Sequence, residues 1–149
     1  MKRWIPVSAA IALVLAMSSQ AFGHCEIPCG IYDDQMRIEM LREHITTIEK
    51  SMKTIGHLQK DPGENANQLI RWVVNKEDHA DKFQHIVSQY FMTQRIAPDA
   101  DKYAEKVGLL HKMLVYSMKC KQTTDLGHVE KLRSLVDQFE TLYFEKGAH

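Results

Sequence analysis

The stretch DDQMRIEMLREHITTIEKSMKTIG, residues 33–56, decides the fold of this chain. Its apolar residues recur at alternating spacings of three and four, which places them along one face of an α-helix. They are Ile38, Leu41, Ile45, Ile48, Met52 and Ile55. Asp33 is a suitable N-cap for this helix, and Gly56 lies near its C-terminal end. The stretch therefore predicts a long amphipathic helix.

Three further segments repeat the helical pattern. The second contains Val73, Ala80, Phe83, Val87 and Tyr90, with Lys76 as an interruption; the third Tyr103, Val107, Leu110 and Leu114; the fourth Val129, Leu132, Val136, Phe139 and Tyr143. Turn signals at 61–63, 97–99 and 122–124 separate the segments, and no alternating strand pattern occurs. The sequence predicts an all-α fold, an antiparallel up-down four-helix bundle over residues 33–149.

Residues 1–23 have the features of a cleaved secretory signal peptide. Lys2 and Arg3 are followed by a run from Val7 to Met17 that is apolar apart from Ser8, and the segment ends in Ala-Phe-Gly. The run is shorter than the ~20 apolar residues that a membrane-spanning helix needs. We therefore expect a periplasmic or secreted protein with no membrane segment in its mature form, cleaved near the junction of Gly23 and His24.

The charge of the chain is balanced, with 19 basic and 19 acidic side chains. Removing the leader would leave a slight excess of acidic residues. Nucleic acids and anionic membranes require a basic patch, so the balance argues against both as partners.

The sequence HCEIPCG, residues 24–30, would begin the mature chain. The α-amine of His24 and the backbone nitrogen of Cys25 would close a five-membered ring on a metal, and that nitrogen with the Cys25 thiolate would close another. The Cys29 thiolate would complete an N₂S₂ set, which suits the tetragonal geometry preferred by Ni(II) and Cu(II). The His24 imidazole would reach only an axial position. Thiolate and amide donors would favour one-electron cycling of the metal.

Two simpler interpretations of the cysteines remain open from the residues alone. In an exported chain, Cys25 and Cys29 would by default form a small disulfide. Cys120 lies within a helical pattern and is expected to be a partly buried or idle thiol.

The histidines outside residue 24 show no paired pattern with a carboxylate and are expected to be surface or partly buried residues. They are His44, His57, His79, His85, His111, His128 and His149.

The pattern formed by His24, Cys25, Pro28, Cys29, Gly30 and Tyr32 resembles the nickel hook of the nickel-dependent superoxide dismutases. We call residues 24–32 the hook. The resemblance implies a superoxide dismutase that converts superoxide to dioxygen and hydrogen peroxide by a Ni(II)/Ni(III) cycle. It implies one nickel ion per chain, an antioxidant role and a homohexamer, with nickel maturation factors as further partners.

The resemblance also implies roles for individual residues. The metal ligands would be His24, Cys25 and Cys29.

Tyr32 and Tyr90 would flank the metal pocket, and Glu39 would orient the axial imidazole. The chain is one residue shorter than better-known members between Tyr32 and Arg37, so Glu43 is the alternative to Glu39. A family arginine beside the imidazole has no obvious counterpart, and His79 lies near its place. The competing functional hypothesis is an exported, non-enzymatic bundle that binds nickel or copper.

Overall fold

The computed structural model describes residues 32–145. Contacts divide the chain into two units, Met1–Tyr32 and Asp33–His149, and the second is described here by itself. The predicted leader and the hook up to residue 31 lie outside the described residues. Predictions that fall on them are therefore not tested by the structure.

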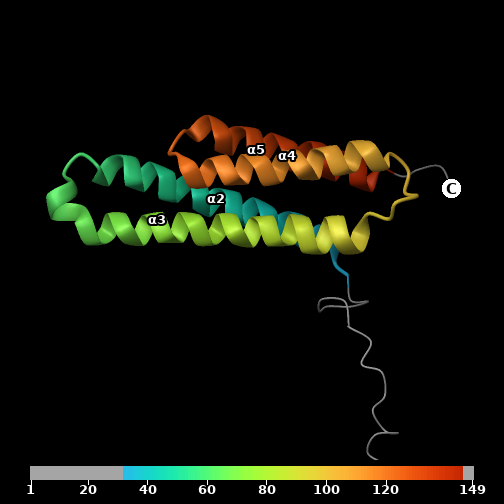
Figure 1. The fold of residues 1–149 in the computed structure, drawn as a ribbon, viewed down its shortest axis with the longest axis horizontal. Helices are drawn as coiled ribbons and strands as arrows, with labels where there is room; N and C mark the ends of the chain where they lie inside the picture. The colour runs from blue at the N-terminus through green and yellow to red at the C-terminus, as the bar shows by residue number, and fades with distance from the viewer. Residues whose placement is uncertain (1–31, 146–149) are drawn as a thin grey trace, which may run out of the picture. The chain divides into compact units, whose positions relative to one another are not determined.

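The described residues form a bundle of four long helices in antiparallel, up-down order (Figure 1). The elements are α2 (Asp34–Leu58), α3 (Pro62–His85), its π-helical continuation η1 (Ile86–Arg95), α4 (Tyr103–Gln122) and α5 (Leu126–Phe144). Helix α2 packs on α3 and α5, and α4 packs on the same two helices. Residues 32–145 contain no strand, so the predicted all-α bundle is confirmed. None of these helices is long and apolar enough to cross a membrane.

Aspartates begin three of the helices. The Asp33 carboxylate accepts a hydrogen bond from the backbone nitrogen of Met36, which confirms its predicted role as the N-cap of α2. Asp61 caps α3 and Asp125 caps α5 in the same way. The turn predicted at residues 61–63 is shorter than expected, because Pro62 already begins α3. Proline suits this first position, since its missing N–H would have no partner there.

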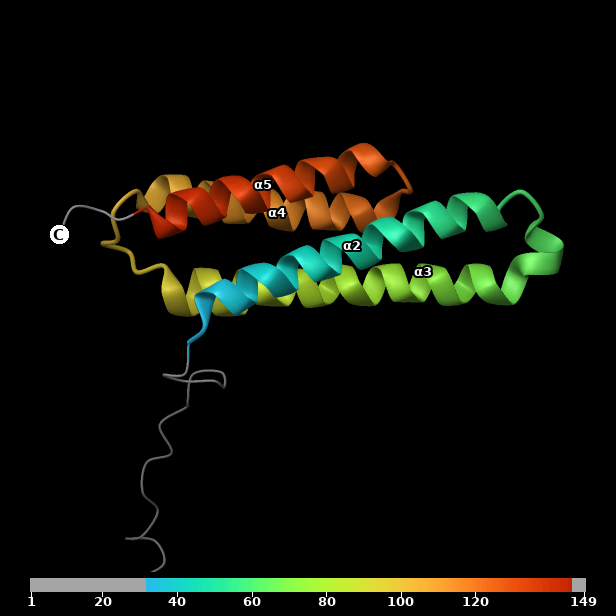
Figure 2. The same ribbon diagram turned by 180° about the vertical axis from the view of Figure 1, so that it is seen from behind.

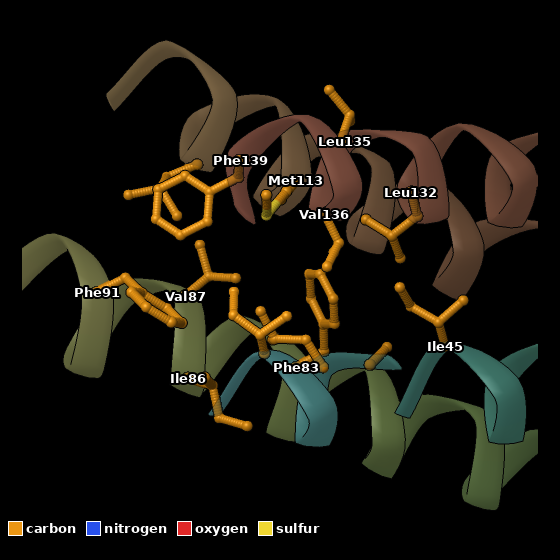
Figure 3. Packing of buried hydrophobic residues seen from close by; sticks show 14 of the residues in the cluster. Ile45, Phe83, Ile86, Val87, Phe91, Met113, Leu132, Leu135, Val136 and Phe139 are labelled. Carbon is orange, nitrogen blue, oxygen red and sulfur yellow. The ribbon is translucent and has the colours of Figure 1, made fainter. Parts of the chain in front are cut away.

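The core is a single apolar cluster drawn from all four helices (Figure 3). Phe83 of α3, Phe91 of η1 and Phe139 of α5 are fully buried in it, and the stripe predicted for α2 is buried throughout. In α4 the buried face is shifted from the prediction. It contains Leu110, Met113, Ser117 and Cys120, while Tyr103 is exposed. Ser117 can occupy a buried position because its hydroxyl donates to the Ala80 carbonyl at 3.1 Å.

The stripe predicted for α3 differs from the structure at its first residue, Val73. Lys76 is only 4% exposed, whereas Val73 is exposed. The Lys76 ammonium donates to the Lys121 carbonyl at 2.5 Å and the Thr123 carbonyl at 3.3 Å, at the C-terminal end of α4. A cation is favourable there because the last carbonyls of a helix lack partners.

The α2–α3 hairpin extends past the connection between α4 and α5 (Figures 1 and 2). Lys76 lies at the level where α4 ends, so the part of α3 before it is not covered by that helix. Ile70 is 66% exposed there, and Val73 and Val74 are exposed beside it. We call Ile70, Val73 and Val74 the tip patch.

Candidate active site

The predicted metal ligands His24, Cys25 and Cys29, together with Pro28 and Gly30, lie outside the described residues. Within residues 32–145, no group of three or more His, Cys, Asp or Glu side chains is arranged to hold a metal ion. Tyr32, the last residue of the hook, is exposed. Among the residues predicted for the site, Tyr90 belongs to a polar cluster at the beginning of α2, the helix that follows the hook.

The carboxylate of Asp34 is the centre of that cluster. Its Oδ1 accepts hydrogen bonds from the Tyr90 hydroxyl at 2.6 Å and from Arg95 Nε at 2.8 Å. Its Oδ2 accepts from Arg95 Nη2 at 2.7 Å and from the Tyr143 hydroxyl at 2.7 Å. The donors come from η1 and α5, so one side chain in the first turn of α2 connects three elements.

The protonation states in the cluster follow from these contacts. Burial alone would raise the pKa of Asp34, but the hydrogen bonds from Arg95, Tyr90 and Tyr143 together hold it below its ordinary value of 3.8. Burial, with the Asp34 carboxylate beside it, raises the pKa of Tyr90 to about 12. The same causes raise the pKa of Tyr143. At neutral pH the cluster is thus a carboxylate that accepts from a guanidinium and two neutral phenols.

The π-helical segment η1 explains how Tyr90 and Arg95 reach the same carboxylate. In an α-helix, residues five apart point about 140° away from each other, because each residue turns the chain by about 100°. A π-helix pairs residue i with residue i+5 and so brings such residues onto one face. The side chain of Thr93 donates to the Ser88 carbonyl and that of Gln94 to the Gln89 carbonyl, each five residues back. The sequence pattern predicted an uninterrupted α-helix here.

Of the other residues predicted for the site, Tyr90 is placed in this cluster and Glu39 is not. Tyr90 is 5% exposed, and the Arg37 guanidinium lies 5.0 Å from the centre of its ring. Glu39 and Glu43 are both exposed on α2. Neither carboxylate forms a hydrogen bond or an ion pair with another residue of the described region, so the choice between them stays a prediction.

Two histidines that the sequence left as isolated residues are in contact. Nδ1 of His44 in α2 lies 3.1 Å from Nδ1 of His79 in α3, and His44 is 8% exposed. Burial, followed by the neighbouring His79, lowers the pKa of His44. A hydrogen bond between the rings requires one nitrogen with a proton and one without. No local pattern could have revealed the pair, because its members lie 35 residues apart.

The third cysteine lies away from the cluster, near the C-terminal end of α4. Cys120 is a free and fully buried thiol, and burial raises its pKa to about 11. It remains protonated at neutral pH and is a poor metal ligand, because metals bind the thiolate. The sequence prediction of an idle thiol agrees with this environment.

A four-helix bundle preceded by a segment with imidazole and thiol donors defines a helical metalloprotein. The family model described as nickel-containing superoxide dismutase matches residues 18–147, and the chain belongs to that family. It is similar to "Superoxide dismutase [Ni]" of Streptomyces seoulensis, with 24% identity over 91% of this chain and 96% of the relative. The protein of the same name from Streptomyces coelicolor is 28% identical, over 82% and 86%.

No solved structure matches the chain significantly. The family membership makes the protein a nickel-dependent oxidoreductase with superoxide as its substrate. The alternative of a non-enzymatic metal-binding bundle is not favoured.

Proposed function

We propose that His24, Cys25 and Cys29 hold one nickel ion per chain once cleavage has made His24 the N-terminal residue. The donor set fits this metal, because an amine, a backbone amide and two thiolates suit the tetragonal preference of Ni(II). The environment of Cys120 supports the assignment, since a buried, protonated thiol leaves Cys25 and Cys29 as the remaining sulfur donors. When bound, nickel supplies the one-electron redox chemistry that converts superoxide and protons into dioxygen and hydrogen peroxide.

The observation that carries the proposal is the fixed position of Tyr90. The resemblance assigns this tyrosine to the metal pocket, and its hydroxyl is held by Asp34 at 2.6 Å in the first turn after the hook. Because Tyr90 stays neutral, it adds no negative charge that would repel an approaching anion. In the same proposal, Tyr32 flanks the pocket and Glu39 fixes the orientation of the His24 imidazole.

The ligand set is tested by the mature N-terminus. A chain that begins at His24 should bind one nickel ion and turn over superoxide, whereas a chain that begins at Phe22 should do neither, because its His24 nitrogen is an amide. Metal analysis and a superoxide assay on the two chains decide the question. An active, nickel-loaded chain that begins at Phe22 would exclude the amine ligand.

The role of Glu39 needs a separate comparison. Glu39→Gln should retain nickel but turn over at least about tenfold more slowly, which is typical of losing a carboxylate that orients a metal-bound histidine. Glu43→Gln should be nearly neutral in the same assay. The opposite result would move the role to Glu43, one helical turn further along α2.

We further propose export and assembly into a homohexamer. The leader sequence supports export, and N-terminal sequencing of periplasmic or secreted protein tests it: a chain that retains residues 1–23 would contradict cleavage.

The tip patch supports assembly, because exposed apolar patches mark interaction surfaces. Light scattering should give a hexameric mass for the wild type and a smaller mass for the double variant Ile70→Ser, Val74→Ser. A monomeric wild type would contradict the hexamer.

A further inference from the structure

Arg37 differs from Arg95 and Lys82 because no carboxylate within residues 32–145 forms an ion pair with it. Arg95 is paired with Asp34 at 2.7 Å, and Lys82 with Asp78 at 2.7 Å. The Nε atom of Arg37 is buried without a hydrogen-bond partner. Its Nη1 meets only the Met40 sulfur, at 3.5 Å. A guanidinium whose donors are left unused in this way can still donate to a ligand.

The position of Arg37 connects an open pocket with Tyr90. The pocket has a volume of about 460 Å³ and is lined by Arg37, Met40, His44, Asp81, Lys82, His85 and Ile86. Two of the charged residues in its wall are compensated, since Lys82 pairs with Asp78 and Asp81 pairs with Lys121 at 2.6 Å. Arg37 is left as the uncompensated charge, and its guanidinium lies over the Tyr90 ring.

The net charge of the whole chain does not attract anions to this surface. Basic and acidic side chains balance at 19 each, so attraction has to come from a local charge. A guanidinium is well suited to this task because it is weakly hydrated and presents several N–H donors in one plane. Small inorganic anions, including superoxide, are the ligand class that fits the guanidinium of one half-exposed arginine in the wall of an open pocket.

We propose that Arg37 is an anion-guiding residue that draws superoxide to the pocket beside Tyr90. The inference rests on the proposed place of Tyr90 next to the metal, and it adds the source of attraction for the substrate. Arg37 would act before the chemistry, by raising the local concentration of the anion. Its effect should therefore appear in kcat/KM and in the dependence of kcat/KM on salt.

The kinetic test compares nickel-loaded wild type, Arg37→Met, Arg37→Lys and the control Arg42→Met over a series of ionic strengths. Arg42 lies on the same helix but is compensated by Asp137 and Glu140, so its loss changes the net charge equally. We expect kcat/KM of Arg37→Met to fall about tenfold at low salt, the lower end of the range for electrostatic steering. Its salt dependence should be flatter than that of the wild type, because little attraction remains to be screened.

Arg37→Lys should retain most of the rate and the salt dependence, since it keeps the charge, and Arg42→Met should match the wild type. The proposal is overturned if Arg37→Met keeps the wild-type rate and salt dependence, or if Arg37→Lys falls as far as Arg37→Met with nickel still bound. Nickel content and circular dichroism accompany each assay. Loss of nickel or of helix in Arg37→Met would assign Arg37 a structural role and would also overturn the proposal.

A second test does not depend on turnover. Crystals of the nickel-bound wild type soaked in bromide should show an anomalous peak beside the Arg37 guanidinium, and crystals of Arg37→Met should lack it. A peak in both, or in neither, contradicts an anion site at Arg37. If the wild type binds bromide at Arg37 but does not turn over superoxide, the proposed function fails while the anion site stands.

Discussion

The two ends of the bundle differ in the environment of their side chains. At the end where α2 begins, the Asp34 carboxylate accepts hydrogen bonds from Tyr90, Arg95 and Tyr143, so these three side chains share one partner. At the other end, α2 and α3 run beyond their partner helices (Figure 2). The tip patch on this part of α3 is exposed. The comparison indicates that side-chain geometry is fixed at the beginning of α2, whereas the far end leaves apolar side chains exposed.

The largest difference between the two ends should appear in the cysteines. Cys25→Ser or Cys29→Ser should lose nickel and turnover completely, because a neutral hydroxyl replaces an anionic sulfur donor. Cys120→Ser, near the C-terminal end of α4, should keep both. Metal analysis, a superoxide assay and circular dichroism measure the three properties, and helix content should be unchanged in the two hook variants. Loss of nickel in Cys120→Ser alone would mean that the ligand set is misassigned.

The next largest effect should come from Asp34. Asp34→Asn removes the charge that Arg95 and the two tyrosines bind, and it should lower the free energy of unfolding by about 3 kcal/mol, the upper range for hydrogen bonds to a charged group. The matched control is Glu49→Gln, which weakens half-buried ion pairs with Arg133 of α5 and Lys53 of α2 and should cost about 1 kcal/mol. Urea unfolding at pH 7 measures both.

The contribution of Asp34 to stability should depend on pH. Its folded pKa lies below 3.8, so its stabilisation is complete above that pH and is lost as the pH falls through the folded pKa. The wild type should therefore lose part of its stability below about pH 4 by this linkage, and Asp34→Asn should lack that part. Similar acid profiles for wild type and Asp34→Asn would show that the cluster does not fix the hook end.

The smallest effect should come from His44, between the two ends. Its folded pKa lies below 6.5, so the unfolded chain takes up the proton first, and stability falls as the pH decreases from 6.5 toward the folded pKa. His44→Gln should cost about 1 kcal/mol at pH 7.5, the value of one hydrogen bond. It should also reduce the loss of stability between pH 7.5 and 5.5. The exposed His111→Gln is the control, and urea midpoints at the two pH values measure the difference; an unchanged slope in His44→Gln would contradict the assignment.

Local patterns predicted the fold well, because a stripe such as that of α2 depends only on neighbouring residues. They failed at Val73, since periodicity gives the buried face of a helix but not the point where its partner helix ends. The hook was recognisable for the same local reason: its donors lie within six residues of one another.

The rest of the candidate site depends on residues far apart in the sequence. Tyr90 was found through the family resemblance, but its partner Asp34 lies 56 residues away. No spacing rule connects them. The π-helical segment was missed because its buried residues, Ile86, Val87, Tyr90 and Phe91, have a spacing that an amphipathic α-helix also shows.

The segment η1 has a consequence for how the length of this chain can change. A stretch that pairs each residue with the fifth one along holds one residue more per turn than the α-helix on which it follows. Removing any one residue between Tyr90 and Arg95 would leave them four apart, and residues four apart lie only about 40° from each other, on one face of an ordinary α-helix. Substitutions at these intervening positions leave the spacing intact. The π-helical segment therefore lets the chain hold one residue more between Tyr90 and Arg95 while both side chains still contact Asp34, and a relative one residue shorter here could make the same two contacts from an uninterrupted α-helix.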